Sequence, residues 1–193
     1  LLTGLGAQHL QGREINDPFA FGLLDRADLI AAHNSKFDLA FIERRYPNLA
    51  GRAWACSCSE IDWLKPGFEG RSQSVLLAHA GWFSAAHRAA ADVWALFWLL
   101  QHRQRGPGES TARTHLARLL EASARTTVMV QAQRAPYAKK DLLRARGYHW
   151  NPAAGFWQIE VKSGMAEHEQ AWGYRMGLPA LTTRPITACE RHR

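Results

Sequence analysis

One stretch decides the fold that we expect for this chain: Leu29-Ile30-Ala31-Ala32-His33-Asn34-Ser35-Lys36-Phe37-Asp38. Its first four residues indicate a short buried strand, and a polar turn then leads into a helical pattern over 36–45 that Pro47 closes. A strand, a turn and a helix in this order are typical of α/β proteins. The polar side chains after the strand are candidates for a binding site, because ligands collect where the strands of open α/β sheets end.

The surrounding residues continue the α/β pattern. We expect the end of a helix over 20–25, a second short strand over 54–57, and helices over 72–80 and 86–103. The last of these helices carries two apolar stripes at helical spacing. The stripes consist of Val93, Leu96, Phe97 and Leu100, and of Trp94 and Trp98. We therefore expect other parts of the protein to cover this helix on most sides.

A break in the apolar pattern divides the chain. The run Gln-His-Arg-Gln-Arg-Gly-Pro-Gly-Glu over 101–109 stops any helix, so we place a boundary near Gly106. We expect an α/β domain over 1–105, a linker with a helix over 106–125, and a small basic α+β module over 126–193. The elements expected in this module are a strand over 126–131, a helix over 138–146, a hairpin of 148–150 and 156–161, and a helix over 165–175.

The charge of the chain is positive and uneven. The formal net charge is +7, of which residues 1–105 contribute +1 and residues 106–193 contribute +6, and a basic second half favours a polyanionic partner. Because basic residues alternate there with aromatic ones, as in single-strand binders, we expect nucleic-acid contacts from four of them. These four are Lys139, Lys140, Arg144 and Arg146. The alternative is that Trp150 and Trp157 form the core of the module while the basic side chains only solvate its surface.

The cysteines and the apolar runs bear on the compartment. The chain has three cysteines, and Cys56 and Cys58 stand too close in sequence for an unstrained bridge. With His79, these two cysteines have poor spacing for zinc. The longest apolar run, 93–100, is far shorter than the ~20 residues of a membrane helix. We therefore expect a cytoplasmic protein in a reducing compartment, without a membrane partner.

Asp38 is the first candidate for chemistry. It stands three and four residues before Phe41 and Ile42, so we expect its carboxylate on a face that apolar side chains direct inward. A buried carboxylate is costly unless a metal ion or hydrogen-bond donors compensate it. The alternative is a helix cap, because Ser35 and Asp38 have the spacing of a capping box.

His87 and Asp92 form the second candidate group. Asp92 precedes Leu96 and Leu99 by four and seven residues and is therefore also expected on an apolar face. Inside one regular helix, His87 would be rotated roughly 140° from Asp92. The two side chains can therefore converge only if His87 lies at the helix entrance or in the loop before it. Taken alone, His87 is more typical of a surface or capping histidine.

In order, these residues resemble a known enzyme family. His-Asn-x-x-Phe-Asp at 33–38 and His-x-x-x-x-Asp at 87–92 are similar to the second and third motifs of the DEDDh 3′–5′ exonucleases, which include the proofreading epsilon subunit of bacterial DNA polymerase III. The segment around Thr3-Gly4-Leu5 resembles the Thr-Gly-Ile that precedes the second motif. Further stretches are similar to a bacterial epsilon-like subfamily: 54–57, 61–63, 67–68, 71–72, 140–143, 145–148, 150–152 and 185–188.

The resemblance implies removal of nucleotides from DNA 3′ ends with two divalent ions, Mg²⁺ or Mn²⁺, and a DNA polymerase subunit as a partner. It implies that Asp38 and Asp92 are metal ligands and that His87 is the general base, a role that suits an imidazole. It also implies substrate contacts from five residues: Thr3, Leu5, His33, Asn34 and Phe37. An RNA 3′ end is the alternative substrate, because related enzymes trim RNA.

The family's first motif, Asp-x-Glu, is the main departure. It should precede Thr3, yet only Leu1 and Leu2 stand there. Glu14 and Asp17 follow this segment and do not replace the motif. We therefore expect a partial ribonuclease H-like fold, with helices on a truncated sheet, in a chain that is inactive as a fragment. We favour a truncated sequence over a true loss of the motif; the alternative outside enzymology is a non-catalytic nucleic-acid-binding module.

Overall fold

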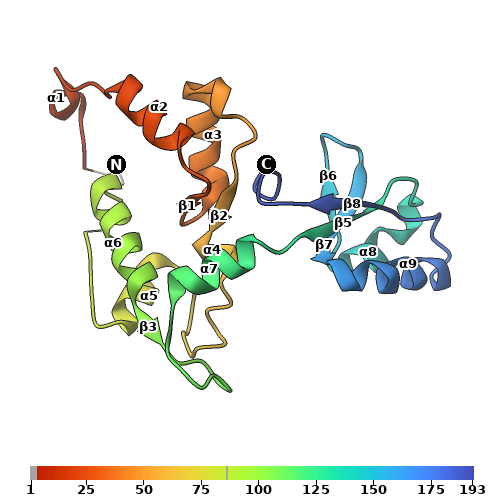
Figure 1. Cartoon of the computed structure of the whole chain (residues 1–193). Coiled ribbons are helices and arrows are strands. Elements are labelled where there is room, and N and C mark those ends of the chain that lie inside the picture. Colours follow the sequence, from red (N-terminus) through yellow and green to blue (C-terminus); the bar gives the residue numbers. More distant parts are fainter. Residues whose placement is uncertain (1–3, 86) are drawn as a thin grey trace. The chain divides into compact units, whose positions relative to one another are not determined.

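The computed structural model describes residues 4–85 and 87–193 and shows two compact units (Figure 1). Unit 1 comprises Leu1–Ala124 and Ala188–Arg193, and unit 2 comprises Arg125–Thr187. The expected division differs in two respects. Most of the expected linker over 106–125 belongs to unit 1, and the last six residues return to unit 1 rather than ending the basic module.

Unit 1 contains the expected strand, turn and helix. Strand β1 (Ile30–Ala32) leads into α3 (Ser35–Arg45), and the chain returns through η1 (Pro47–Leu49) to β2 (Trp54–Cys56). The two strands are parallel, with Ile30 opposite Trp54 and Ala32 opposite Cys56. Helices α1 (Ala7–Leu10) and α2 (Asp17–Asp25) precede them, and α4 (Ser57–Glu60) follows. The expected α/β class is confirmed.

Three further helices build the core of unit 1. They are α5 (Gln73–His79), α6 (Ala89–Gln101) and α7 (His115–Ser123), and a short antiparallel pair, β3 (Arg103–Gln104) and β4 (Arg113–Thr114), connects the last two. The buried residues of this core are Ala55, Ile61, Trp63, Phe68, Leu76, Leu77, Ala95, Leu99, Leu100 and Leu119. Because Leu119 lies in this cluster, α7 is a core helix and not part of a linker.

The expectation that other elements cover α6 on most sides is wrong. Helix α6 packs on α5 and α7 through one side only, which carries Ala95, Leu99 and Leu100. Four large apolar side chains on the rest of the helix remain exposed: Val93 at 67%, Trp94 at 61%, Phe97 at 48% and Trp98 at 51%. Helical spacing shows which residues share a face, but it does not show whether a partner element covers that face.

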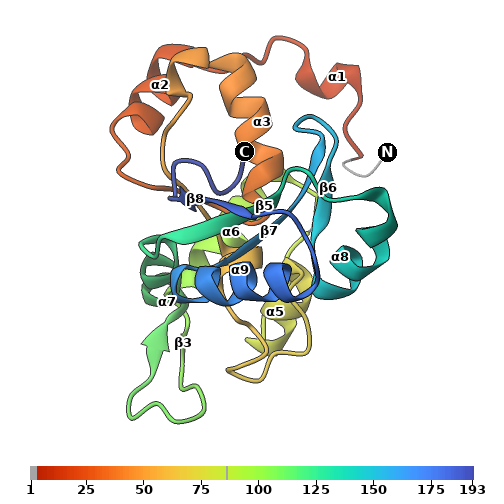
Figure 2. The same ribbon diagram turned by 90° about the vertical axis from the view of Figure 1, so that its right-hand side faces the viewer.

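Unit 2 is a four-stranded antiparallel sheet with two helices. Its elements are β5 (Thr127–Ala132), η2 (Tyr137–Lys139), α8 (Lys140–Arg146), β6 (His149–Asn151), β7 (Phe156–Lys162), η3 (Ser163–Met165), α9 (Ala166–Arg175) and β8 (Thr182–Ile186). The strand order is β6-β7-β5-β8, which with the β-α-β-β-α-β succession is the ferredoxin-like arrangement (Figure 1, Figure 2). Edge strand β8 has no counterpart among the expected elements; it contains Pro185, which an edge strand tolerates.

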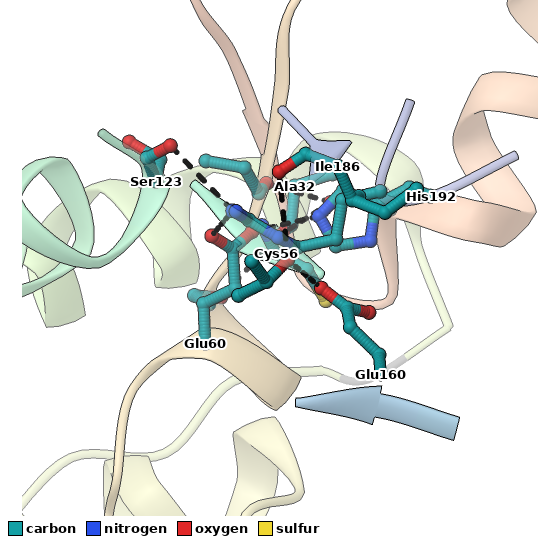
Figure 3. Close-up of polar contacts among 12 residues, drawn as sticks. Ala32, Cys56, Glu60, Ser123, Glu160, Ile186 and His192 are labelled. Carbon is teal, nitrogen blue, oxygen red and sulfur yellow. Dashed lines mark hydrogen bonds and ion pairs between the residues drawn. The ribbon is translucent and has the colours of Figure 1, made fainter. Parts of the chain in front are cut away.

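The carboxyl-terminal residues are held by a buried carboxylate. Glu60, at the end of α4, accepts hydrogen bonds from the Cys56 backbone N–H at 2.7 Å and from Arg191 at 2.8 Å, and its Oε1 lies 2.7 Å from His192 Nε2 (Figure 3). The side chains of Glu60, Arg191 and His192 are almost fully buried. Burial alone would raise the pKa of Glu60, but the contacts with His192, Cys56 and Arg191 lower it.

Across the described residues, no helix is both long and apolar enough to span a membrane.

Candidate functional site

The first candidate segment is a tight turn at the carboxyl ends of β1 and β2. Asn34 takes a left-handed conformation, with φ of 79°, and α3 begins at the next residue. The Ser35 hydroxyl donates a 2.6 Å hydrogen bond to the Ala55 carbonyl, which ties the start of α3 to β2. Ser35 is therefore an anchor inside the helix. The capping-box alternative is wrong, because the N-cap is Asn34.

His33 lies between the two strand ends. Its Nδ1 is 2.9 Å from the Ser57 hydroxyl at the start of α4, and that hydroxyl lies within hydrogen-bond distance of the Ala32 carbonyl. Partial burial lowers the pKa of His33, which favours the neutral ring. Asn34 and Phe37, the other expected substrate contacts here, are exposed. The turn thus places one held imidazole beside two accessible side chains.

Asp38 occupies the first turn of α3 and is half-buried. Loss of water around the carboxyl group raises its pKa, and the hydrogen bond to its own backbone N–H opposes this in part. The expected inward direction of Phe41 is wrong: Phe41 is exposed and packs on Phe37, with ring centroids 4.9 Å apart. Only Ile42 of the expected pair is half-buried. The carboxylate of Asp38 therefore lies at the border of the packed side of α3.

His87 lies outside α6, in the turn that precedes it. The helix begins at Ala89, later than expected, and the left-handed conformation of His87, with φ of 66°, separates this residue from the helix. Asp92 lies in the first turn and is half-buried, and its backbone carbonyl accepts a 2.7 Å hydrogen bond from Gln73. This is the placement that convergence of His87 with Asp92 requires.

The segment around Gly4 lies beside the start of α6. A Cβ atom built on Gly4 would lie 3.9 Å from Nη2 of Arg88, the N-cap residue of α6. Thr3, an expected substrate contact, lies outside the described residues, and Leu5 is half-buried. The structure therefore brings Gly4 close to Arg88 within the third motif, although the two residues are more than 80 positions apart in the chain.

The two carboxylate helices pack on different elements. Helix α3 contacts β1, β2 and η1, whereas α6 contacts α5 and α7. Within 4–85 and 87–193, no group of three or more His, Cys, Asp or Glu side chains is arranged to hold a metal ion. The residues present therefore do not complete a two-metal site.

A pocket with aromatic walls adjoins the third motif. It has a volume of about 590 Å³ and lies between the end of α5 and the first turns of α6. Its aromatic lining residues are Trp82, Phe83, Trp94 and Trp98. Ala91, the neighbour of Asp92, also lines it. Trp82 and Trp98 meet edge to face, with centroids 6.1 Å apart. The sequence contained a signal for this pocket, because Trp94 and Trp98 stand four residues apart.

The four basic residues expected to contact nucleic acid fall into two pairs. Lys139 donates to the Met176 carbonyl at 2.9 Å, and Arg146 forms a 2.7 Å ion pair with buried Glu169. Lys140 and Arg144 instead contact aromatic rings, those of exposed Tyr137 and buried Trp157. The alternative that both tryptophans form the core of the module is correct for Trp157, which is buried, but not for Trp150, which is 49% exposed.

Comparisons with known proteins do not assign a function to this geometry. No family model, curated protein or solved structure matches the chain.

Proposed function

We propose that unit 1 carries the second and third motifs of a metal-dependent 3′–5′ exonuclease of the DEDDh type that acts on DNA ends. One observation carries the proposal: His87 lies in the turn before α6 and Asp92 in the first turn of that helix. In this turn His87 is free of the regular helix, which would rotate it roughly 140° from Asp92. The neighbouring Gly4 and the half-buried Asp38 support the same assignment.

The chemistry of the donors suits the proposal only in part. In such enzymes four carboxylates hold two divalent ions, which activate water and stabilise the leaving oxygen. Asp38 and Asp92 would be two of the four, and the described residues do not supply the others as a group. His87 would accept a proton from the attacking water. We therefore expect little or no hydrolysis by this chain alone.

The aromatic pocket gives the proposed site a place for a base. Trp82, Trp94 and Trp98 present ring faces and edges within one apolar pocket that begins at the third motif. Aromatic rings bind unpaired bases by stacking, which tolerates any base. Under this proposal β1, β2, α3 and α6 are parts of a ribonuclease H-like fold. RNA 3′ ends are the alternative substrate, because related enzymes trim RNA.

The test is release of mononucleotides from 3′-labelled DNA with Mg²⁺, by this chain and by a version extended with the residues encoded before Leu1. We expect activity in the extended protein and a loss of about 10²–10⁴-fold in His87→Ala. The matched control is His168→Ala, which replaces an exposed histidine of α9. Unchanged activity in His87→Ala, or an upstream segment without Asp-x-Glu, would overturn the proposal.

A further inference from the structure

A continuous row of cationic and aromatic side chains runs across one side of unit 2. Lys140 lies over the ring of Tyr137, with Nζ 4.3 Å from the centroid and 2.9 Å from the hydroxyl. Arg144 lies over the ring of Trp157 at 5.5 Å, and Trp157 meets Trp150 with centroids 5.8 Å apart. We call these five residues the basic aromatic row. We propose that it binds single-stranded DNA.

The geometry of α8 makes this row continuous. Lys140 and Arg144 are four residues apart on α8, so their side chains share one face of the helix. Tyr137, three residues before Lys140, extends the row at one end, and the β6–β7 hairpin supplies Trp157 and Trp150 at the other. The row thus has two neighbouring cations at its centre, with one ring at one end and two rings at the other.

The exposed rings at both ends of the row favour a ligand with flat apolar faces. Tyr137 is 80% exposed and Trp150 is 49% exposed, whereas Trp157 is buried and supports the row from below. Bases of a single strand stack on such rings while Lys and Arg contact the phosphates. A duplex offers phosphates but no free base faces, so the exposed rings favour an unpaired strand.

The structure also shows which basic residues are not available to a ligand. Lys139 binds the carbonyl at the end of α9, and Arg146 is held by Glu169 and by the ring of Trp172 at 5.1 Å. Both residues therefore stabilise unit 2 itself. Asp141 is the acidic neighbour of the row, 3.6 Å from Arg144, and both side chains are mostly exposed. Exposed pairs of this kind are weak, so Arg144 remains able to contact a phosphate.

The row lies on unit 2 and does not depend on the proposed hydrolysis by unit 1. A protein that binds DNA without cleaving it would retain this inference and contradict the exonuclease proposal. If the protein cleaved DNA, and neutralising the row left its DNA binding unchanged, the exonuclease proposal would stand and this inference would fail.

The experiment is fluorescence anisotropy of the full chain with a labelled oligothymidylate of about 20 nucleotides, at salt concentrations between about 50 and 200 mM. We expect K140Q/R144Q to bind at least about tenfold more weakly and to reduce the slope of log K against log salt by about 1.4, since each single-strand phosphate contact contributes about 0.7. Trp150→Ala should weaken binding by about 5- to 150-fold, and Trp150→Phe should restore much of it.

The matched control is K162Q/R175Q, which removes the same charge from exposed residues of unit 2 outside the row. We expect this control to lose less than about threefold at moderate salt. Three outcomes would overturn the proposal: no binding by the unaltered chain, equal losses in the two double variants, or equal competition by a duplex of the same length. Circular dichroism of each variant shows whether unit 2 is folded. If Trp150→Ala does not fold, the Trp150→Phe variant still tests the role of this ring.

Discussion

At the scale of single residues, His115 is the most unusual side chain of unit 1. It is fully buried, and neither ring nitrogen has a hydrogen-bond partner within the described part of the chain. The rings of Trp63 and Phe68 lie 4.7 Å and 5.5 Å from it, and His102 stacks on it at 5.8 Å. Burial, helped by the charges of His102 and Arg118, lowers the pKa of His115 to about 4.

This pKa predicts that the protein loses stability in weak acid. The unfolded chain takes up the proton near the ordinary value of 6.5, and the folded protein only near 4. The unfolded state therefore binds more protons between these values, and the free energy of unfolding falls as the pH decreases through this window. We expect a loss of roughly 2 kcal/mol between pH 7.5 and pH 5, measured by urea unfolding. His115→Leu should remove most of this dependence of the free energy of unfolding on pH. An unchanged dependence would show that other groups cause it.

At the scale of elements, α6 differs most from its sequence pattern. Its outer side exposes Val93, Trp94, Phe97 and Trp98, and patches of this kind favour association or ligand binding. We expect Val93→Lys with Phe97→Lys to reduce self-association in sedimentation velocity without lowering the stability of unit 1, because neither side chain belongs to the core. Leu96→Lys, which replaces a residue packed on the core, should instead destabilise unit 1. A stable monomer before and after the double change would contradict the first expectation.

At the scale of the whole molecule, the chain leaves unit 1 after α7, forms unit 2 and returns to unit 1 for its last six residues. Glu60 anchors these last residues in unit 1, because it binds Arg191, which is 131 positions away, and contacts His192. The Trp54 backbone N–H adds a 2.9 Å hydrogen bond to the Ala188 carbonyl. Unit 1 is therefore built from two separate stretches of the chain.

We expect Glu60→Ala to destabilise unit 1 by about 3–5 kcal/mol, because it removes the buried carboxylate that Arg191 and His192 both contact. Hydrogen exchange should show faster exchange over 188–193 and in unit 1, whereas amides of unit 2 keep their protection. Glu69→Ala, at an exposed position of the same unit, is the control and should change stability by less than about 0.5 kcal/mol. Equal loss of protection in both units would show that the return does not act on unit 1 specifically.

Local patterns were sufficient for most elements. The apolar run before His33, the helical spacing of α3 and α8 and the turn at Gly147 depend on residues close in sequence, and the structure contains each of these features. The pattern predicted a helix over 86–103 that includes His87, whereas the structure places His87 in the turn before α6. The chemical roles of Asp38, Asp92 and His87 stay predictions.

The sequence by itself determined where the main helices and strands form, because periodicity and turn residues act over a few positions. Only the tertiary structure decided that α7 joins the core of unit 1, that most of α6 lies exposed, and that Arg146 is held by Glu169 while Arg144 faces outward. The physical reason is that burial and ion pairing depend on contacts between distant residues. A single residue and its neighbours in sequence carry no record of these contacts.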